Sequence, residues 1–306
     1  MMGLSAHNSP PSRSTTSGMA IGTGDALGSR FVPREAADFP ERLRGVKPLA
    51  KGLWVEGRLP GTEPLVAVVG ARAATRAGCQ AVSRLAGELA AGGHGVVSGG
   101  ALGVDAAAHD GALAAGGPTF AVLGCGIDII YPDRHRRLYR AIVASGALLS
   151  EYGPGVPVRT WQFPVRNRLV AALADAVVVA ECWPRSGALI TAQLARRLGR
   201  PLLALPGSPG ADSLLAAGAA LPVTSAAEVR AALAGTLVPA SGRAGEWADP
   251  WAAVCAAVGR GSATVEDVAL KLRIPVAEVL AVLCEADMAG RVRRLPGGRY
   301  EVCRGN

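Results

Sequence analysis

The stretch LVAVVGARAATRAGCQAVSRLAGELAAGGHGVVSGG, residues 65–100, predicts a strand, a helix and a second strand. Its first six and last six residues are apolar runs that do not alternate with polar residues. The segment between them has the apolar spacing of a helix. Continuous apolar strands are typical of parallel sheets that helices cover on both faces.

This unit repeats along the chain. Further apolar runs occur at 119–124, 147–151, 176–181 and 201–207, and GALITAQLARRLG at 187–199 has helical spacing. Strands that alternate with helices indicate an α/β fold. We therefore predict a doubly wound, mostly parallel sheet of extended Rossmann-like type.

The flanking regions differ in composition from the core. The first residues are rich in Ser, Gly, Pro and Thr and read as a disordered tail rather than a secretion signal. After residue 250 come three short helical patterns and a hairpin around Pro-Gly-Gly, which favour a small winged-helix domain. The predicted division is a disordered tail (1–30), a lead-in (31–64), a Rossmann-like main domain (65–234), a linker (235–249) and a winged helix (250–306).

Composition narrows the functional classes. The chain has 306 residues and a net charge of +8, and all but three of its 32 lysines and arginines are arginine. Arginine suits phosphate, so a polyanionic partner is favoured, although base composition of the genome is an alternative cause. Six scattered cysteines and four histidines predict reduced thiols, a cytoplasmic location, no metal and no cofactor. No apolar run reaches the roughly 18 residues of a membrane span.

Nearly every predicted strand ends in glycine, and arginines accompany these glycines. Arg72 follows the first strand, and Arg166 and Arg168 precede the fifth. Glycine lets a backbone approach a ligand, and helix N-termini attract anions. We favour an anion site at this rim over the alternative that the glycines only make tight turns.

The anion is not predicted to be a nucleotide cofactor. No lysine is followed by Ser or Thr, as a P-loop requires, and no G-x-G-x-x-G follows the first strand. Aromatic residues lie near the same strand ends: Tyr131, Tyr152, Trp161, Phe163 and Trp183. Rings beside arginines suit unstacked bases, whereas the alternative is that they anchor the core.

Two further patterns concern structure more than chemistry. Asp105 and His109 are one helical turn apart, and we expect a structural pair that orients the glycine turn before them. In the small domain the expected recognition helix, 276–289, is acidic and would be repelled by a duplex. The basic residues of this small domain lie in its wing instead, which favours an auxiliary or protein-contact role.

In combination, seven motifs resemble one known family. They are VVGAR, SGGALGVDAAAHDGAL, AVLGCGIDIIYP, LLSEYGPG, FPVRNRLVAALAD, SGALITAQLA and LALPG, in this order. The sequence is similar, over about residues 39–233, to the DNA-processing protein A (DprA/Smf) family of bacterial natural transformation. One departure is Ala71, which stands where the family usually has Ser or Thr.

The resemblance implies a non-enzymatic mediator of recombination. Such a protein would bind single-stranded DNA, protect it, load the RecA recombinase onto it, displace single-strand-binding protein and form a homodimer. The implied DNA-binding residues are Arg72, Gly99, Gly100, Gly103, Phe163, Arg166, Asn167, Arg168, Ser186, Gly187 and Thr191.

An enzyme is the alternative. LOG-type phosphoribohydrolases, a related Rossmann-like group, use a glutamate in a Pro-Gly-Gly-x-Gly-Thr-x-x-Glu motif. The corresponding position here is Gln193, and an amide cannot act as a general base.

Overall fold

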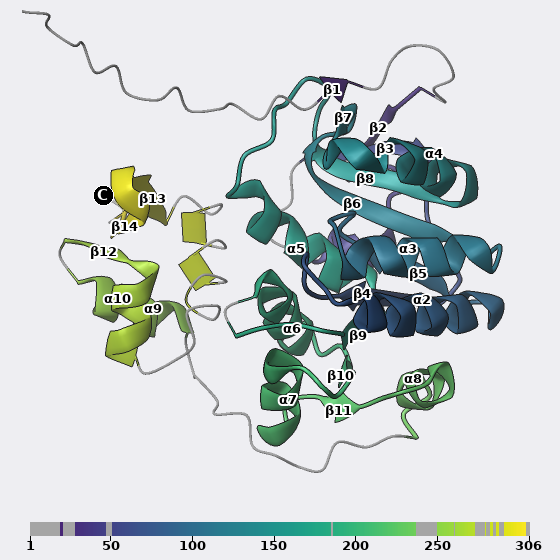
Figure 1. Cartoon of the computed structure of the whole chain (residues 1–306). Helices are drawn as coiled ribbons and strands as arrows, with labels where there is room; N and C mark the ends of the chain where they lie inside the picture. The colour runs from purple at the N-terminus through teal and green to yellow at the C-terminus, as the bar shows by residue number, and fades with distance from the viewer. Residues whose placement is uncertain are drawn as a thin grey trace, which may run out of the picture.

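The computed structural model describes residues 19–20, 28–46, 51–184, 186–236, 250–259, 261–272, 279, 282–283, 286–287 and 291–303. The main part of the described chain is built around one nine-stranded sheet (Figure 1). Its strands, from edge to edge, are β11 (Leu221–Pro222), β10 (Leu202–Ala204), β9 (Ala176–Val179), β4 (Leu65–Val69), β5 (Gly95–Ser98), β6 (Thr119–Gly126), β8 (Ala147–Tyr152), β3 (Gly52–Gly57) and β2 (Arg30–Pro33).

The sheet is doubly wound, as predicted. The seven strands from β11 to β8 are parallel to one another, and every residue of β4 is buried. Side chains of β4 alternate between two apolar cores, with Val66 and Val68 in one and Leu65 and Ala67 in the other. Burial on both faces is the reason these strands carry no polar alternation.

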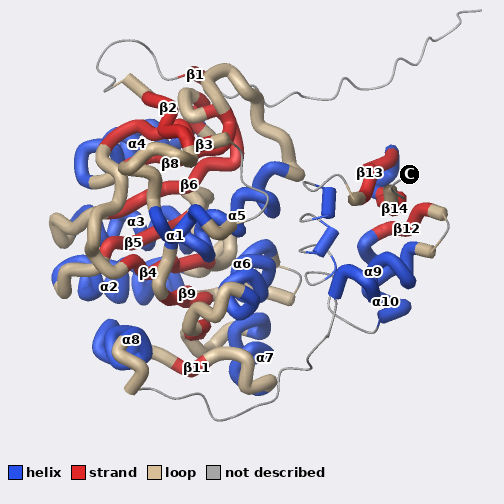
Figure 2. The backbone as a smooth tube through the Cα atoms, turned by 180° about the vertical axis from the view of Figure 1, so that it is seen from behind, coloured by secondary structure: helices blue, strands red, loops and turns tan. Residues whose placement is uncertain are grey.

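Helices cover both faces of the sheet (Figures 1 and 2). One core contains residues of α2 (Arg76–Ala91), α3 (Val104–Ala114) and α8 (Ala226–Leu233). The core on the opposite face contains residues of α1 (Glu41–Arg44), α5 (Gln162–Leu173), α6 (Gly187–Arg197) and α7 (Pro209–Ala216). Helix α4 (Arg136–Ser145) packs over β6 and β8 beside α3.

The strand order reverses beside β4. The chain runs outward from β4 through β5, β6 and β8 on one side, and β9, β10 and β11 extend the sheet on the other. In such sheets the crevice for a ligand lies beyond the carboxyl ends of the strands at this reversal. The glycine turns noted in the sequence follow these ends.

The lead-in completes the sheet, which the sequence patterns did not predict. Strand β3 pairs antiparallel with β8, and β2 pairs antiparallel with β3. Arg42 of α1 forms an ion pair of 2.8 Å with Asp175, just before β9. Within the predicted tail, β1 (Met19–Ala20) pairs with β7 (Ile129–Ile130), and the structure describes nothing earlier.

The C-terminal unit has its own core. It contains α9 (Pro250–Val258), β12 (Ser262–Thr264), α10 (Val265–Leu272) and a hairpin of β13 (Val292–Leu295) and β14 (Arg299–Val302). The sheet order is β12-β14-β13, and the fold is the predicted winged helix. Most of the acidic helix expected at 276–289, with Glu278 and Glu285, lies outside the described residues, as do 237–249 of the linker.

Candidate nucleic-acid interface

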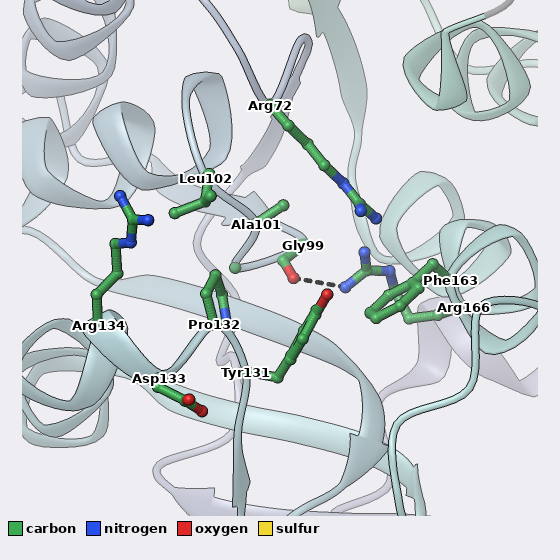
Figure 3. A pocket seen from close by; sticks show the side chains of 11 residues that line it. Arg72, Gly99, Ala101, Leu102, Tyr131, Pro132, Asp133, Arg134, Phe163 and Arg166 are labelled. Atoms are coloured by element: carbon green, nitrogen blue, oxygen red, sulfur yellow. Dashed lines mark hydrogen bonds between the residues drawn. The ribbon is translucent and has the colours of Figure 1, made fainter. Parts of the chain in front are cut away.

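The backbone of the turn after β5 is hydrogen-bonded by two buried side chains, Asp105 and Arg166. Asp105 accepts hydrogen bonds from the backbone N–H groups of Gly99, at 3.1 Å, and Ala101, at 3.2 Å. Arg166 donates to the carbonyl of Gly99 at 2.6 Å, and also to the carbonyl of Val122 (Figure 3). These two N–H groups are therefore used internally and do not form the anion cradle that the glycines suggested.

Gly99 fits between two opposite charges. A Cβ atom at this position would lie 2.5 Å from the Arg166 guanidinium and 2.7 Å from the Asp105 carboxylate. Burial raises the pKa of Asp105, and the nearby Arg166 opposes that rise. Only glycine fits without displacing one of these groups.

A second pair of side chains holds the carbonyl of Gly100. His135 donates through Nδ1 at 3.0 Å, and the Tyr139 hydroxyl lies 3.3 Å away. The same hydroxyl is 2.7 Å from the carbonyl of Tyr131. Burial lowers the pKa of His135, so its ring adds no positive charge at neutral pH.

The expected pairing of Asp105 with His109 holds only in part. Asp105 does orient the glycine turn. His109 instead faces the sheet, with Nδ1 2.7 Å from the Thr119 hydroxyl. Because that hydroxyl donates to the carbonyl of Val96, it accepts the proton of His109.

Two adjoining cavities lie beyond the strand ends at the strand-order reversal. Their volumes are about 380 and about 470 Å³, and together they form what we call the groove. Both are lined by Arg72, Gly99, Ala101, Tyr131, Phe163 and Arg166. Of the predicted site residues, the groove brings together Arg72, Gly99, Gly100, Phe163, Arg166, Asn167, Ser186, Gly187 and Thr191.

Stacked rings and an arginine stand where the cavities meet (Figure 3). The rings of Tyr131 and Phe163 are stacked, with centroids 5.5 Å apart and planes 29° apart. The guanidinium of Arg72 lies 5.0 Å from the centroid of the Phe163 ring. Arg72 is exposed, so its charge is available to a ligand.

The far wall of the second cavity is the start of α6. Ser186 is its N-cap, and the Ser186 hydroxyl accepts from the N–H of Ala188 at 3.3 Å. Asn167 of α5 donates to the carbonyl of Gly187 at 3.2 Å, which ties the two helices together. The positive end of the α6 dipole therefore adds to the field of Arg72.

Two predicted site residues lie elsewhere. Arg168 forms two 2.6 Å hydrogen bonds with the carboxylate of Glu151, and both side chains are less than a tenth exposed. Gly103 caps α3 with φ near +73° and packs against the carbonyls of Ala71 and Arg72. The structure gives both residues a supporting place and puts neither on the groove lining.

The groove also contains residues outside the predicted set. Leu102, Pro132, Asp133 and Arg134 line the first cavity, and Tyr131 had been expected only as a rim aromatic. The signal was present in YPDRHRR, residues 131–137, where four charged side chains follow a strand end. Trp161 and Trp183 are exposed but do not line either cavity.

The described part of the chain differs from metalloproteins, membrane-spanning proteins and disulfide-rich proteins. It contains no cluster of three or more metal-ligating side chains and no helix long and apolar enough to cross a membrane. The cysteines that it includes are not paired in disulfides. Gln193, at the position of the hydrolase glutamate, does not line the groove.

Fold and groove together define a Rossmann-like protein with an arginine-lined crevice and a C-terminal winged helix. The chain belongs to the DNA recombination-mediator protein A family, whose model matches residues 30–234. The model of the DprA winged helix domain matches residues 238–298.

Individual relatives agree with this assignment. A DNA processing protein DprA of Mycobacterium tuberculosis is 41% identical over 298 residues, which cover 90% of this chain and 74% of that protein. The solved DprA structure from Streptococcus pneumoniae has a TM-score of 0.62 and 37% identity, covering 67% of this chain and 74% of that one. That from Helicobacter pylori, described for its single-stranded DNA binding mode, has a TM-score of 0.61 and 31% identity, covering 69% and 97%.

Proposed function

We propose that this protein binds single-stranded DNA in the groove and acts as a recombination mediator in DNA processing. In this role it protects incoming strands in the cytoplasm of a transforming cell and loads RecA onto them, displacing single-strand-binding protein. It works as a homodimer and performs no catalysis. Family membership supports the role in DNA processing, and the single-stranded DNA binding of the Helicobacter pylori relative supports the ligand.

The observation that carries the proposal is the stacked pair of rings, Tyr131 and Phe163, with the guanidinium of Arg72 over the Phe163 ring. The guanidinium can bind a phosphate, and the two rings can stack with a base. Each stacked base contributes about 1–3 kcal/mol in complexes with single strands. The start of α6 supplies a second attraction for phosphate on the opposite wall.

The geometry favours a single strand over a duplex. A base can stack on the Phe163 ring only if one face of the base is exposed. In a duplex, neighbouring base pairs cover both faces of each base. The groove also has two cavities separated by the rings, which suits successive nucleotides more than one compact cofactor.

The test is a salt titration of binding to labelled oligonucleotides, single-stranded against paired. We expect a clear preference for the single strand and a log–log salt slope of about −0.7 per phosphate contacted. Arg72→Ala should weaken binding by roughly tenfold to a hundredfold, since it removes both a charge and a stacking partner. Arg76→Ala is the control, because Arg76 is equally exposed, lies in the next turn and does not line the groove.

Equal affinity for duplex and single strand would contradict the proposal, as would full affinity of the Arg72 variant. Release of free base from a nucleoside monophosphate would favour the hydrolase instead. Gln193 provides no general base for that reaction.

A further inference from the structure

The most concentrated charge in the described main domain lies on the segment that follows Pro132, which begins at the edge of the groove. Arg134, Arg136, Arg137 and Arg140 stand within seven residues, accompanied by a single acid, Asp133. We call these four residues the α4 arginine patch. Arg134, Arg137 and Arg140 are exposed, and Arg136 is partly buried.

Six other arginines of this domain have counter-charges that the patch lacks, whereas others in the described residues, such as Arg76 and Arg84, form no ion pair either. Arg30, Arg42, Arg44, Arg58, Arg168 and Arg200 each lie within ion-pair distance of a carboxylate. Within the described residues, none of the four patch arginines forms an ion pair.

The patch also stands at the wrong end of its helix. Arg136, Arg137 and Arg140 occupy the first turns of α4, which has no acidic residue in its first turn. Positive charge at a helix N-terminus is unfavourable because the dipole is positive there. Local rules of this kind are broken in natural proteins mainly where function requires it.

The patch is continuous with the groove. Arg134 lines the first cavity, across from Phe163 and Arg166 (Figure 3). From there the chain enters α4, which packs on the sheet through Tyr139 and Ile142. The opposite side of the helix, with Arg137 and Arg140, is exposed.

We infer that the α4 arginine patch binds the phosphate backbone of the strand where it leaves the groove. The inference rests on the proposed function and extends it: the groove holds the bases, and the patch holds the next phosphates. Exposed guanidiniums without rings beside them suit a backbone and carry no base preference. The bound strand would then follow a path from the start of α6, across Arg72, to Arg134 and along α4.

The test uses oligothymidylates of increasing length and the double variant Arg137→Ala/Arg140→Ala in the full chain. Neither side chain is buried, so the fold should be retained. For long oligonucleotides we expect roughly tenfold weaker binding and a salt slope smaller by about 1.4, equivalent to two phosphate contacts. The shortest oligonucleotide that binds should be held as well as by the unaltered protein.

The control is Arg84→Ala/Arg230→Ala, which removes the same charge from α2 and α8 at exposed positions that line neither cavity. An equal loss in this control would show a general charge effect and overturn the inference. Equal losses for short and long strands, or no loss for either, would also overturn it. If the unaltered protein bound no single strand of any length, the proposed function would fail first.

An acidic protein segment is the competing occupant. If the double variant kept its affinity for every oligonucleotide but no longer bound a polyglutamate peptide, the patch would belong to a protein partner and the inference would be wrong.

Discussion

The arginines around α1 form ion pairs with carboxylates, whereas Arg72 at the groove lies beside an aromatic ring. Near α1, Arg42 pairs with Asp175 at 2.8 Å and Arg44 with Glu41 at 2.6 Å. At the groove, Arg72 lies over the ring of Phe163. Charge that the protein neutralises itself stabilises the fold, whereas charge left beside a ring or an open cavity is available to an external anion.

The two arginines of FPVRNR repeat this contrast within a single helix. Arg166 lines the groove and holds the glycine turn, while Arg168 is neutralised by Glu151. Both are buried, so a variant that lacks both would lose stability as well as ligand contacts and would not separate the two effects.

The largest expected effect is on stability, from Arg168→Ala. This substitution removes both hydrogen bonds that Arg168 donates to the buried Glu151 carboxylate, and breaking a buried ion pair costs about 3–5 kcal/mol in the free energy of unfolding. Urea denaturation measures it, and Arg30→Ala serves as the control. Arg30 and Asp38 are about half exposed, so their pair should contribute only about 0.2–1 kcal/mol.

Full stability of the Arg168 variant together with lost DNA affinity would reverse this assignment. Arg168 would then be a DNA ligand, as the family motif predicts.

The next effect concerns the rings. Phe163→Leu keeps an apolar side chain but removes the stacking face, and we expect single-strand binding to weaken by about 1–3 kcal/mol. The salt slope should not change, because no phosphate contact is lost. Phe31→Leu is the control, since Phe31 is exposed on the edge strand β2. A change of slope in the Phe163 variant would mean that the ring acts by positioning Arg72.

An effect of similar size concerns the pH dependence of stability. Burial lowers the pKa of His109 to about 3, below its value in the unfolded chain, so the unfolded state binds the proton first. Stability is therefore complete above about pH 6.5 and falls by about 1.4 kcal/mol per pH unit as pH decreases toward the folded pKa. His109→Asn keeps a donor for Thr119 and should lessen this acid sensitivity.

Unfolding measured at about pH 7 and about pH 5 gives the comparison, with a difference of about 2 kcal/mol expected between the two proteins' pH responses. Asp105, whose pKa is raised, acts in the opposite direction in both proteins and cancels in the difference. Identical pH responses would mean that His109 is not the group responsible.

The sequence predicted the sheet well but not its edges. The six apolar runs correspond to β4, β5, β6, β8, β9 and β10, because a strand that is buried on both faces has a continuous apolar sequence. The lead-in strands β2 and β3 have no such run, because they are unevenly buried, and the pairing of β3 with β8 joins segments that lie far apart in the sequence. Their place was decided by pairing with β8.

For the site, sequence alone gave the residue types and the rim on which they gather. Arg72, Phe163 and Arg166 follow strand ends or open a helix, and parallel strands bring such positions to one edge. Residues two apart on a helix, such as Arg166 and Arg168, point about 200° apart, so both could not face one groove. Which of them met Glu151, and that Asp105 would accept from the N–H groups of Gly99 and Ala101, depended on side-chain contacts that only the folded chain creates.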